Sequence, residues 1–161
     1  PLDELLANAD MISVHVPLNK DTYHLINKDT IAKMKTGVYF VNTSRGGLVD
    51  SHALYEGINN GKIKAAGLDV YEEESEIFFE DFSNEHIKDD TLRLLLSSPN
   101  VIITSHQAFL TAEALSNIAK TTLANLDQFF GEGSLDNEIC FLYRDYSEAS
   151  EYVKKRNERC F

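Results

Sequence analysis

Three kinds of side chain that can do chemistry stand at the ends of short apolar runs in this sequence. Arg45, Asp69 and His106 each close or follow such a run, and three glutamates at 72–74 come shortly after Asp69. If the runs are parallel strands, their carboxyl ends gather at one edge of a sheet, where open α/β sheets bind ligands. There an arginine can anchor a carboxylate and polarise a carbonyl, a histidine can transfer a proton, and an acid can orient the imidazole. The set suits chemistry on a carbonyl that carries a neighbouring carboxylate.

Each of these residues has a plainer interpretation when it is taken alone. Arginine is usually exposed, so Arg45 could be a surface residue after a strand, and a single histidine at a strand end is more often a capping or core residue. A guanidinium held by a stiff strand can, however, grip a planar carboxylate or phosphate through two hydrogen bonds. The occurrence of arginine, acid and histidine at separate strand ends favours the functional interpretation.

The elements that must position these residues read as alternating strands and helices. Apolar runs at 11–16, 38–42, 63–70 and 101–103 predict strands, and Pro17 closes the first because it cannot continue a ladder. The run at 38–42 lacks polar alternation, so we expect a strand that is buried on both faces. Strands that alternate with helices imply right-handed crossovers and a parallel sheet. The predicted fold class is α/β, half of a doubly wound domain.

Capping residues predict where the helices begin. The expected N-caps are Asn27 or Asp29, Asp50 or Ser51, and Thr111. Asn60-Gly61 is a good stop for the second of these helices, and the leucines within 92–96 predict a short buried helix. The helix after Thr111 is expected to bury a stripe of residues at helical spacing. That stripe comprises Leu115, Ile118, Ala119, Thr122, Leu126, Phe129 and Phe130.

Composition indicates an ordinary globular protein. The 161 residues are 43% hydrophobic and 25% charged, with a formal net charge of −11. This charge argues against a nucleic-acid or anionic-membrane partner, since both need a basic face. Cys140 and Cys160 provide no metal framework and fit a reduced, cytoplasmic protein. No apolar run approaches membrane-spanning length, and no signal sequence is visible. A start at Pro1 without methionine suggests a fragment, although removal of a leader would produce the same start.

Three segments carry a resemblance to a known family. The stretches NTSRG at 42–46, GLDVYEEE at 67–74 and SHQAFLT at 105–111 closely resemble the NAD-dependent D-2-hydroxyacid dehydrogenases. The similarity runs over roughly residues 1 to 138, and the acidic insertion at 75–90 resembles the fermentative D-lactate dehydrogenase branch of that family. The resemblance implies a partial Rossmann-like sheet, the C-terminal half of a dinucleotide-binding domain. It also implies hydride transfer between NADH and pyruvate, or a related 2-keto acid, to give D-lactate.

The resemblance implies a catalytic role for three residues. Arg45 would bind the substrate carboxylate and polarise its ketone, and His106 would donate the proton as hydride arrives at the carbonyl carbon. Glu74 would pair with His106 and favour its protonated form, as a close carboxylate does. Glu72 and Glu73 are expected to be solvated.

The resemblance also implies positions that line the cofactor NAD. Asp69 would accept a hydrogen bond from the nicotinamide amide, and small polar residues would line the nicotinamide side. Phe109 resembles an apolar wall beside the substrate, with a core aromatic as an equal alternative. The implied cofactor-binding residues are Val16, Pro17, Thr22, Thr43, Ser44, Arg45 and Asp69.

The resemblance divides the chain into three parts. Residues 1–110 would form a partial NAD-binding domain, 111–138 a helix returning toward an absent substrate domain, and 139–161 an atypical tail. The sequence contains no Gly-x-Gly-x-x-Gly fingerprint, which in the family lies upstream. We therefore expect the isolated chain neither to bind NAD tightly nor to turn over. A homodimer through the cofactor domain is possible.

An alternative function belongs to a different class. Corepressors of the C-terminal-binding-protein type share this fold and a similar arginine, glutamate and histidine, but act by recruiting partners. They tend to carry a tryptophan after the histidine, and this chain contains no tryptophan. The enzyme interpretation is therefore preferred.

Other candidate sites have weaker support. His52 and Glu56 are four residues apart on one helix face but lack a third ligand of matching spacing, so an exposed pair is favoured over a metal site. The carboxylates at 72–90 lack the spacing of an EF-hand loop. Three other histidines have no obvious partner: His15, His24 and His86.

Overall fold

The computed structural model describes residues 1–77, 87–131 and 135–137, and the chain divides into two units. The first unit is Pro1–Ala108 and the second is Phe109–Phe161. The first unit holds every residue for which the sequence predicts a catalytic or cofactor-binding role. Each unit is described by itself.

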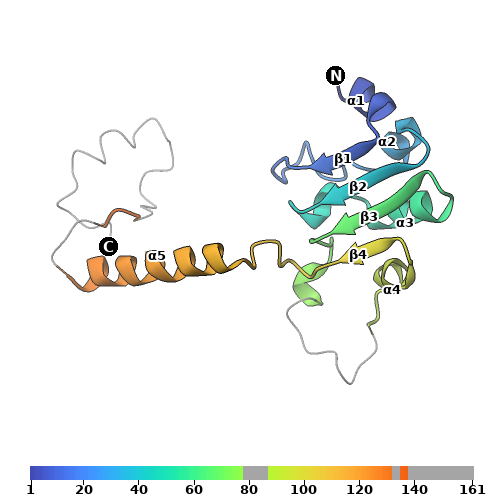
Figure 1. The fold of residues 1–161 in the computed structure, drawn as a ribbon. Helices are drawn as coiled ribbons and strands as arrows, with labels where there is room; N and C mark the ends of the chain where they lie inside the picture. Colours follow the sequence, from blue (N-terminus) through green and yellow to red (C-terminus); the bar gives the residue numbers. More distant parts are fainter. Residues whose placement is uncertain (78–86, 132–134, 138–161) are drawn as a thin grey trace. The chain divides into compact units, whose positions relative to one another are not determined.

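The first unit is built on a four-stranded parallel sheet with strand order β1-β2-β3-β4 (Figure 1). The strands are β1 (Met11–Val14), β2 (Val38–Asn42), β3 (Ile63–Leu68) and β4 (Val101–Ile103). Val14 pairs with Asn42, Asn42 with Leu68, and Leu68 with Ile103, so the four carboxyl ends stand level. The residues that follow the strands therefore meet at one edge. This confirms the predicted α/β architecture.

One helix precedes the first strand and others connect the strands. They are α1 (Leu2–Asn8), α2 (Lys28–Lys33), α3 (Ser51–Asn59) and α4 (Asp90–Ser97), with short 3-10 turns η1 (Gly46–Leu48) and η2 (Glu74–Glu76). Asp50 caps α3 by accepting from the backbone N–H of Ala53 at 2.9 Å. Gly61 adopts the left-handed region, φ 79°, directly after α3, as the Asn-Gly stop predicts.

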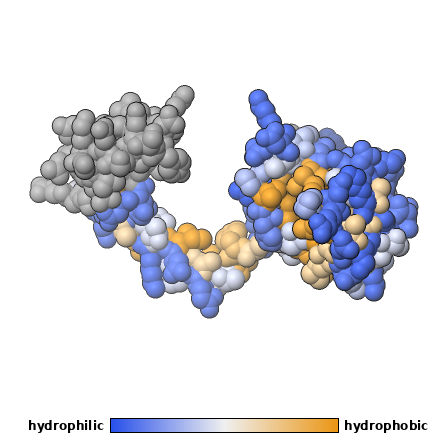
Figure 2. Space-filling view, turned by 90° about the horizontal axis from the view of Figure 1, so that it is seen from above, coloured by the Kyte–Doolittle hydropathy of each residue, from blue (hydrophilic) through white to orange (hydrophobic). Residues whose placement is uncertain are grey.

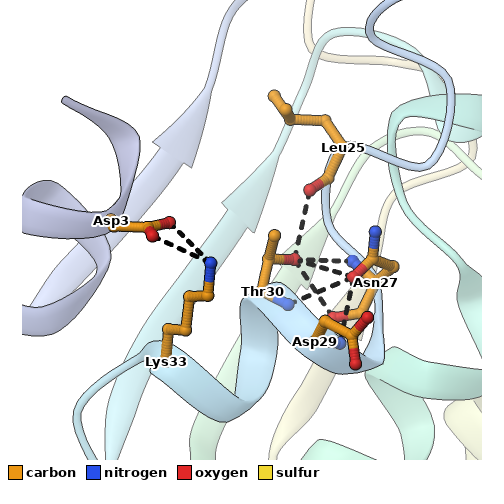
Figure 3. Close-up of polar contacts among 6 residues, drawn as sticks. All are labelled: Asp3, Leu25, Asn27, Asp29, Thr30 and Lys33. Carbon is orange, nitrogen blue, oxygen red and sulfur yellow. Dashed lines mark hydrogen bonds and ion pairs between the residues drawn. The ribbon is translucent and has the colours of Figure 1, made fainter.

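The start of α2 shows how local sequence fixes a boundary (Figure 3). The Asn27 side chain accepts from the N–H groups of Asp29 and Thr30, and the Thr30 hydroxyl accepts from the N–H of Asn27 in return. At the other end of α2, Lys33 Nζ donates to both carboxylate oxygens of Asp3, at 2.8 and 2.9 Å. This ion pair ties α2 to α1.

Within the first unit, the described helices cover one face of the sheet (Figure 1). Burial alternates along β2, where Val38, Phe40 and Asn42 are buried, while Tyr39 is 39% exposed. The prediction that this strand is buried on both faces is therefore wrong, because within the first unit the described helices pack against one side of the sheet. Figure 2 shows apolar side chains at the surface of this unit among hydrophilic ones.

The core lies between the sheet and its helices. Its largest fully buried side chains are Phe40, Leu6, Ile26, Leu48, Leu54, Ile63, Leu92, Leu95 and Val38. Of the leucines of α4 that were predicted to be buried, Leu92 and Leu95 are buried, whereas Leu94 and Leu96 are exposed.

The described residues of the second unit include the long helix α5 (Ala112–Phe130), which Thr111 caps as predicted and Gly131 follows (Figure 1). None of its residues is buried, so the predicted buried stripe is wrong. The helical spacing of apolar residues in α5 indicates one apolar face. The spacing does not show which other element would pack against that face. No described helix is long and apolar enough to cross a membrane.

Candidate active site

A histidine and a carboxylate meet at the carboxyl edge of the sheet. His106 Nδ1 lies 2.9 Å from Glu74 Oε1, with side chains 34% and 18% exposed. The other oxygen of Glu74 accepts from the backbone N–H of Tyr71 at 3.0 Å. Glu74 is therefore held in place before it meets His106. With Nδ1 donating to the carboxylate, Nε2 of the ring is the nitrogen that can exchange a proton with a ligand.

The turn that carries His106 has an unusual backbone conformation. Ser105 and His106 both lie in the left-handed region, with φ 50° and 56°, which non-glycine residues seldom adopt. The buried Asp69 carboxylate holds this turn, because it accepts from the Thr104 hydroxyl and from the N–H groups of Gln107 and Ala108. The N–H of His106 also donates to the Asp69 carbonyl.

The ionisation of Asp69 follows from this cage. Burial opposes the charge, but hydrogen bonds from Thr104, Ala108 and Gln107, together with nearby His106, outweigh burial and hold the pKa of the Asp69 carboxyl below its usual value. The anion is the form that the turn needs. The sequence did not suggest this structural role, whereas the predicted contact of Asp69 with the nicotinamide amide stays a prediction.

Arg45 is exposed, but its backbone is firmly held and the turn that follows it is buried. Its carbonyl accepts from the Asn42 side chain at 2.9 Å, and Asn42 is almost fully buried. Gly46 follows, and a Cβ at this position would stand 2.0 Å from the carbonyl oxygen of Tyr71. Only glycine permits this approach. Among the described residues, the Arg45 guanidinium hydrogen-bonds only to the carbonyl of Ser44, at 2.7 Å.

The Arg45 turn and the His106–Glu74 pair are joined through Tyr71. The carbonyl of Tyr71 faces Gly46, and its N–H donates to Glu74. One peptide segment thus touches both the turn that carries the arginine and the acid that holds the histidine. The three predicted catalytic residues therefore belong to one edge of the sheet.

Apart from Asp69, the predicted cofactor-binding residues fall into two joined loops, one after β1 and one after β2. Ser44 Oγ donates to the carbonyl of Val16 at 3.0 Å, and Thr22 Oγ1 donates to the carbonyl of Pro17 at 2.6 Å. Thr43 is exposed beside them.

A second histidine–carboxylate pair lies at the same edge, and the sequence did not reveal it. His24 Nε2 is 2.6 Å from Glu72 Oε1, and the Tyr23 hydroxyl donates to the same oxygen at 2.9 Å. The expectations that Glu72 is solvated and that His24 has no partner are therefore wrong. His15 also has a partner, because Nε2 lies 2.7 Å from the hydroxyl of Ser13. The only feature of the sequence that could have indicated this pair is that His24 follows one predicted strand and Glu72 follows another.

The remaining candidates are the His52–Glu56 pair, Phe109 and the acidic run with His86. His52 and Glu56 form an exposed pair on α3, 4.0 Å apart, and no three potential ligands cluster around a metal site among the described residues. Phe109 is exposed and begins the second unit. His86 and residues 78–86 of the acidic run lie outside the described residues.

Comparison with known proteins identifies the first unit. Residues 1–108 match the family model described as "D-isomer specific 2-hydroxyacid dehydrogenase, NAD binding domain". The chain is 50% identical over 140 residues to a protein of Clostridium sporogenes named aromatic 2-oxoacid reductase. It is 49% identical over 138 residues to the D-lactate dehydrogenase of Escherichia coli.

A solved structure extends the comparison to the fold. The D-lactate dehydrogenase TP0037 of Treponema pallidum superposes with a TM-score of 0.80 at 41% identity, covering 86% of this chain and 42% of that one. The two sequence relatives are likewise matched over 86% of this chain and 42% of their own length. The chain thus spans less than half the length of its relatives, and the sheet is that of a Rossmann-like NAD-binding domain.

Proposed function

The chain belongs to the D-isomer specific 2-hydroxyacid dehydrogenases, a family of oxidoreductases with NAD as cofactor, and on this basis we propose that its protein reduces pyruvate to D-lactate. The hydrogen bond between His106 and Glu74 is the observation that carries this proposal. It supplies an oriented acid at the sheet edge where a dinucleotide-binding domain places its ligand. Arg45 on the neighbouring turn supplies an anchor for the carboxylate of a 2-keto acid.

Each of the three side chains has a separate task. Arg45 binds the substrate carboxylate through its planar fork and places positive charge near the ketone oxygen. His106 Nε2 donates a proton to that oxygen as the carbonyl is reduced, and takes it back in the reverse direction. Glu74 accepts from Nδ1, so it fixes the orientation of the ring and stabilises the imidazolium. When bound, NADH supplies the hydride.

Several residues are proposed to contact the cofactor. Val16, Pro17 and Thr22 would lie along its ribose region, and Thr43 with Ser44 along the nicotinamide. The joined loops on which these residues lie support this placement. The reduced thiols expected of Cys140 and Cys160 support a cytoplasmic location, and a homodimer through the cofactor domain remains part of the proposal.

The substrate could also be a larger 2-oxoacid. This second candidate is favoured by the C. sporogenes relative, which is named an aromatic 2-oxoacid reductase and is as similar to the chain as the E. coli D-lactate dehydrogenase. The carboxylate anchor and the proton donor serve both substrates equally, because they contact the atoms that all 2-oxoacids share. Only the walls around the substrate side chain distinguish them.

Oxidation of NADH by the complete protein that carries this chain tests the proposal. We expect turnover with pyruvate, a lower kcat/KM with phenylpyruvate, and D-lactate as the product on a chiral column. A higher kcat/KM for phenylpyruvate would replace pyruvate by the aromatic substrate. Absence of turnover with either acid would contradict the proposed activity and favour a binding protein of the same fold.

A further inference from the structure

We propose that His24, Glu72 and Tyr23, here called the His24 cluster, position the turn that carries Arg45 and thereby set the affinity for the substrate carboxylate. The inference deepens the proposed function, on which it rests. It concerns residues for which the sequence suggested no role. None of the three would touch the reacting atoms, so they are positioning residues.

The His24 cluster is a compact polar unit at the carboxyl edge. One oxygen of Glu72 takes both hydrogen bonds, from the His24 ring at 2.6 Å and from the Tyr23 hydroxyl at 2.9 Å. The two rings stack, with centroids 3.9 Å apart and planes 16° apart. The side chains of His24 and Glu72 are only 30% and 21% exposed. Partial burial makes such a charge-assisted bond stronger than one on an open surface.

The backbone of His24 is bonded directly to the turn after β2. The N–H of His24 donates to the carbonyl of Gly47 at 2.9 Å, and the N–H of Ile26 donates to the carbonyl of Leu48 at 2.9 Å. His24 is in the left-handed region, with φ 50°, which is unfavourable for a side chain with a Cβ. The contacts made by its ring hold the residue in this conformation.

Glu72 approaches the same turn from the opposite side. A Cβ on Gly46 would stand 2.5 Å from the backbone nitrogen of Glu72, and a Cβ on Gly47 would stand 3.5 Å from the Tyr23 ring. The segment Arg45-Gly46-Gly47 is therefore enclosed between the loop after β1 and the loop after β3. The bond between His24 and Glu72 closes this enclosure by linking the two loops across it.

The two histidine–carboxylate pairs differ in the nitrogen that they use. His106 bonds its acid through Nδ1, close to the backbone, which leaves Nε2 at the tip of the ring for a proton. His24 bonds its acid through Nε2, so the tip of its ring is occupied. The geometry of the first pair suits proton transfer, and the geometry of the second suits fixing a loop. Displacing a carboxylate anchor by about 1 Å can cost up to about 10²-fold in activity.

The dissociation constant of oxamate, an unreactive analogue of pyruvate, tests this inference in the complete protein with NADH present. Glu72→Gln keeps the size of the side chain but removes the charge, and His24→Ala removes the ring. We expect each to weaken oxamate binding about tenfold, the value of one charge-assisted hydrogen bond, and to raise the KM for the 2-oxoacid alike. The kcat should change less than about threefold, since His106 and Glu74 remain.

Glu73→Gln is the matched control, because it removes the same charge from the adjacent, exposed residue. It should leave oxamate binding within about twofold. The double variant His24→Ala with Glu72→Gln should bind oxamate no more weakly than either single variant, because the two residues act as one unit.

Three outcomes would overturn the inference: wild-type protein that fails to bind oxamate, equal effects of Glu72→Gln and Glu73→Gln, or a fall in kcat with unchanged oxamate affinity. Loss of the proposed function has a different signature. If the protein bound oxamate and depended on Glu72 but oxidised no NADH, the positioning role would stand and the proposed reaction would fail.

Discussion

The proposed roles of His106 and Glu74 depend on single atoms, because Nδ1 of the ring is bonded to Glu74 and Nε2 is the nitrogen left for a ligand. Replacing His106 by Asn removes the proposed proton donor, and we expect kcat to fall by about 10²–10⁴. Glu74→Gln keeps an acceptor for Nδ1 but removes the negative charge that stabilises the imidazolium, so a smaller fall in kcat is expected. Single-turnover oxidation of NADH measures both variants. A His106→Asn protein with wild-type rates would remove this residue from the mechanism.

Arg45 is expected to act mainly on binding. Lysine keeps the charge but loses the planar fork, so Arg45→Lys should raise the KM for the 2-oxoacid about tenfold while kcat falls less. Its backbone is held by Asn42 and Gly46, so the substitution should not disturb the turn. Steady-state kinetics over a range of 2-oxoacid concentrations provides the measurement. An unchanged KM would show that the carboxylate is anchored elsewhere.

Neighbouring glutamates show how far single residues could be predicted. Glu72, Glu73 and Glu74 are identical in chemistry, and resemblance to a family selects only Glu74. In the structure Glu72 contacts His24, Glu73 is exposed, and Glu74 contacts His106. Consecutive side chains in an irregular loop point in directions set by its dihedral angles, and composition does not specify those angles. The role of Glu72 was therefore missed.

At the scale of elements, the turn after β4 depends on a buried anion. Asp69→Asn would place an amide NH₂ where the carboxylate now accepts three hydrogen bonds, so at pH 7 we expect a loss of about 1–3 kcal/mol of unfolding free energy.

The pH dependence of that loss follows from the lowered pKa of the Asp69 carboxyl. A carboxyl with a lowered folded-state pKa contributes stability above its unfolded value of about 3.9, and this contribution disappears as pH falls through the folded value. The difference between the wild type and Asp69→Asn should therefore shrink below about pH 4. Urea unfolding at several pH values measures it, and a difference that stays constant down to pH 3 would contradict the assignment.

The positions of strands and helix caps could be predicted from the sequence better than the burial of their side chains. Strands at 38–42 and 101–103 and the caps Asp50 and Thr111 follow from local patterns, because apolar runs and caps act over a few residues. The exposed Tyr39 and the open stripe of α5 could not be predicted, since burial depends on which other elements lie nearby. A pattern indicates that a face is apolar but not what covers it.

At the scale of the whole molecule, the 86% of the chain that matches its relatives corresponds to 42% of their length. The residues of this chain would form one side of the proposed dinucleotide site. We therefore expect the isolated chain neither to bind NADH tightly nor to reduce pyruvate. Titration calorimetry with NADH and an activity assay, each beside the complete protein, measure this. Activity of the isolated chain close to that of the complete protein would contradict the expectation.

A crystal structure of the complete protein with NADH and oxamate tests the central claim most directly. That claim is that Arg45 and the His106–Glu74 pair serve one 2-oxoacid site. We expect the oxamate carboxylate to bind the Arg45 guanidinium. The amide carbonyl oxygen of oxamate, which takes the place of the ketone oxygen of pyruvate, should lie within hydrogen-bond distance of His106 Nε2. Oxamate bound away from either side chain would contradict the account.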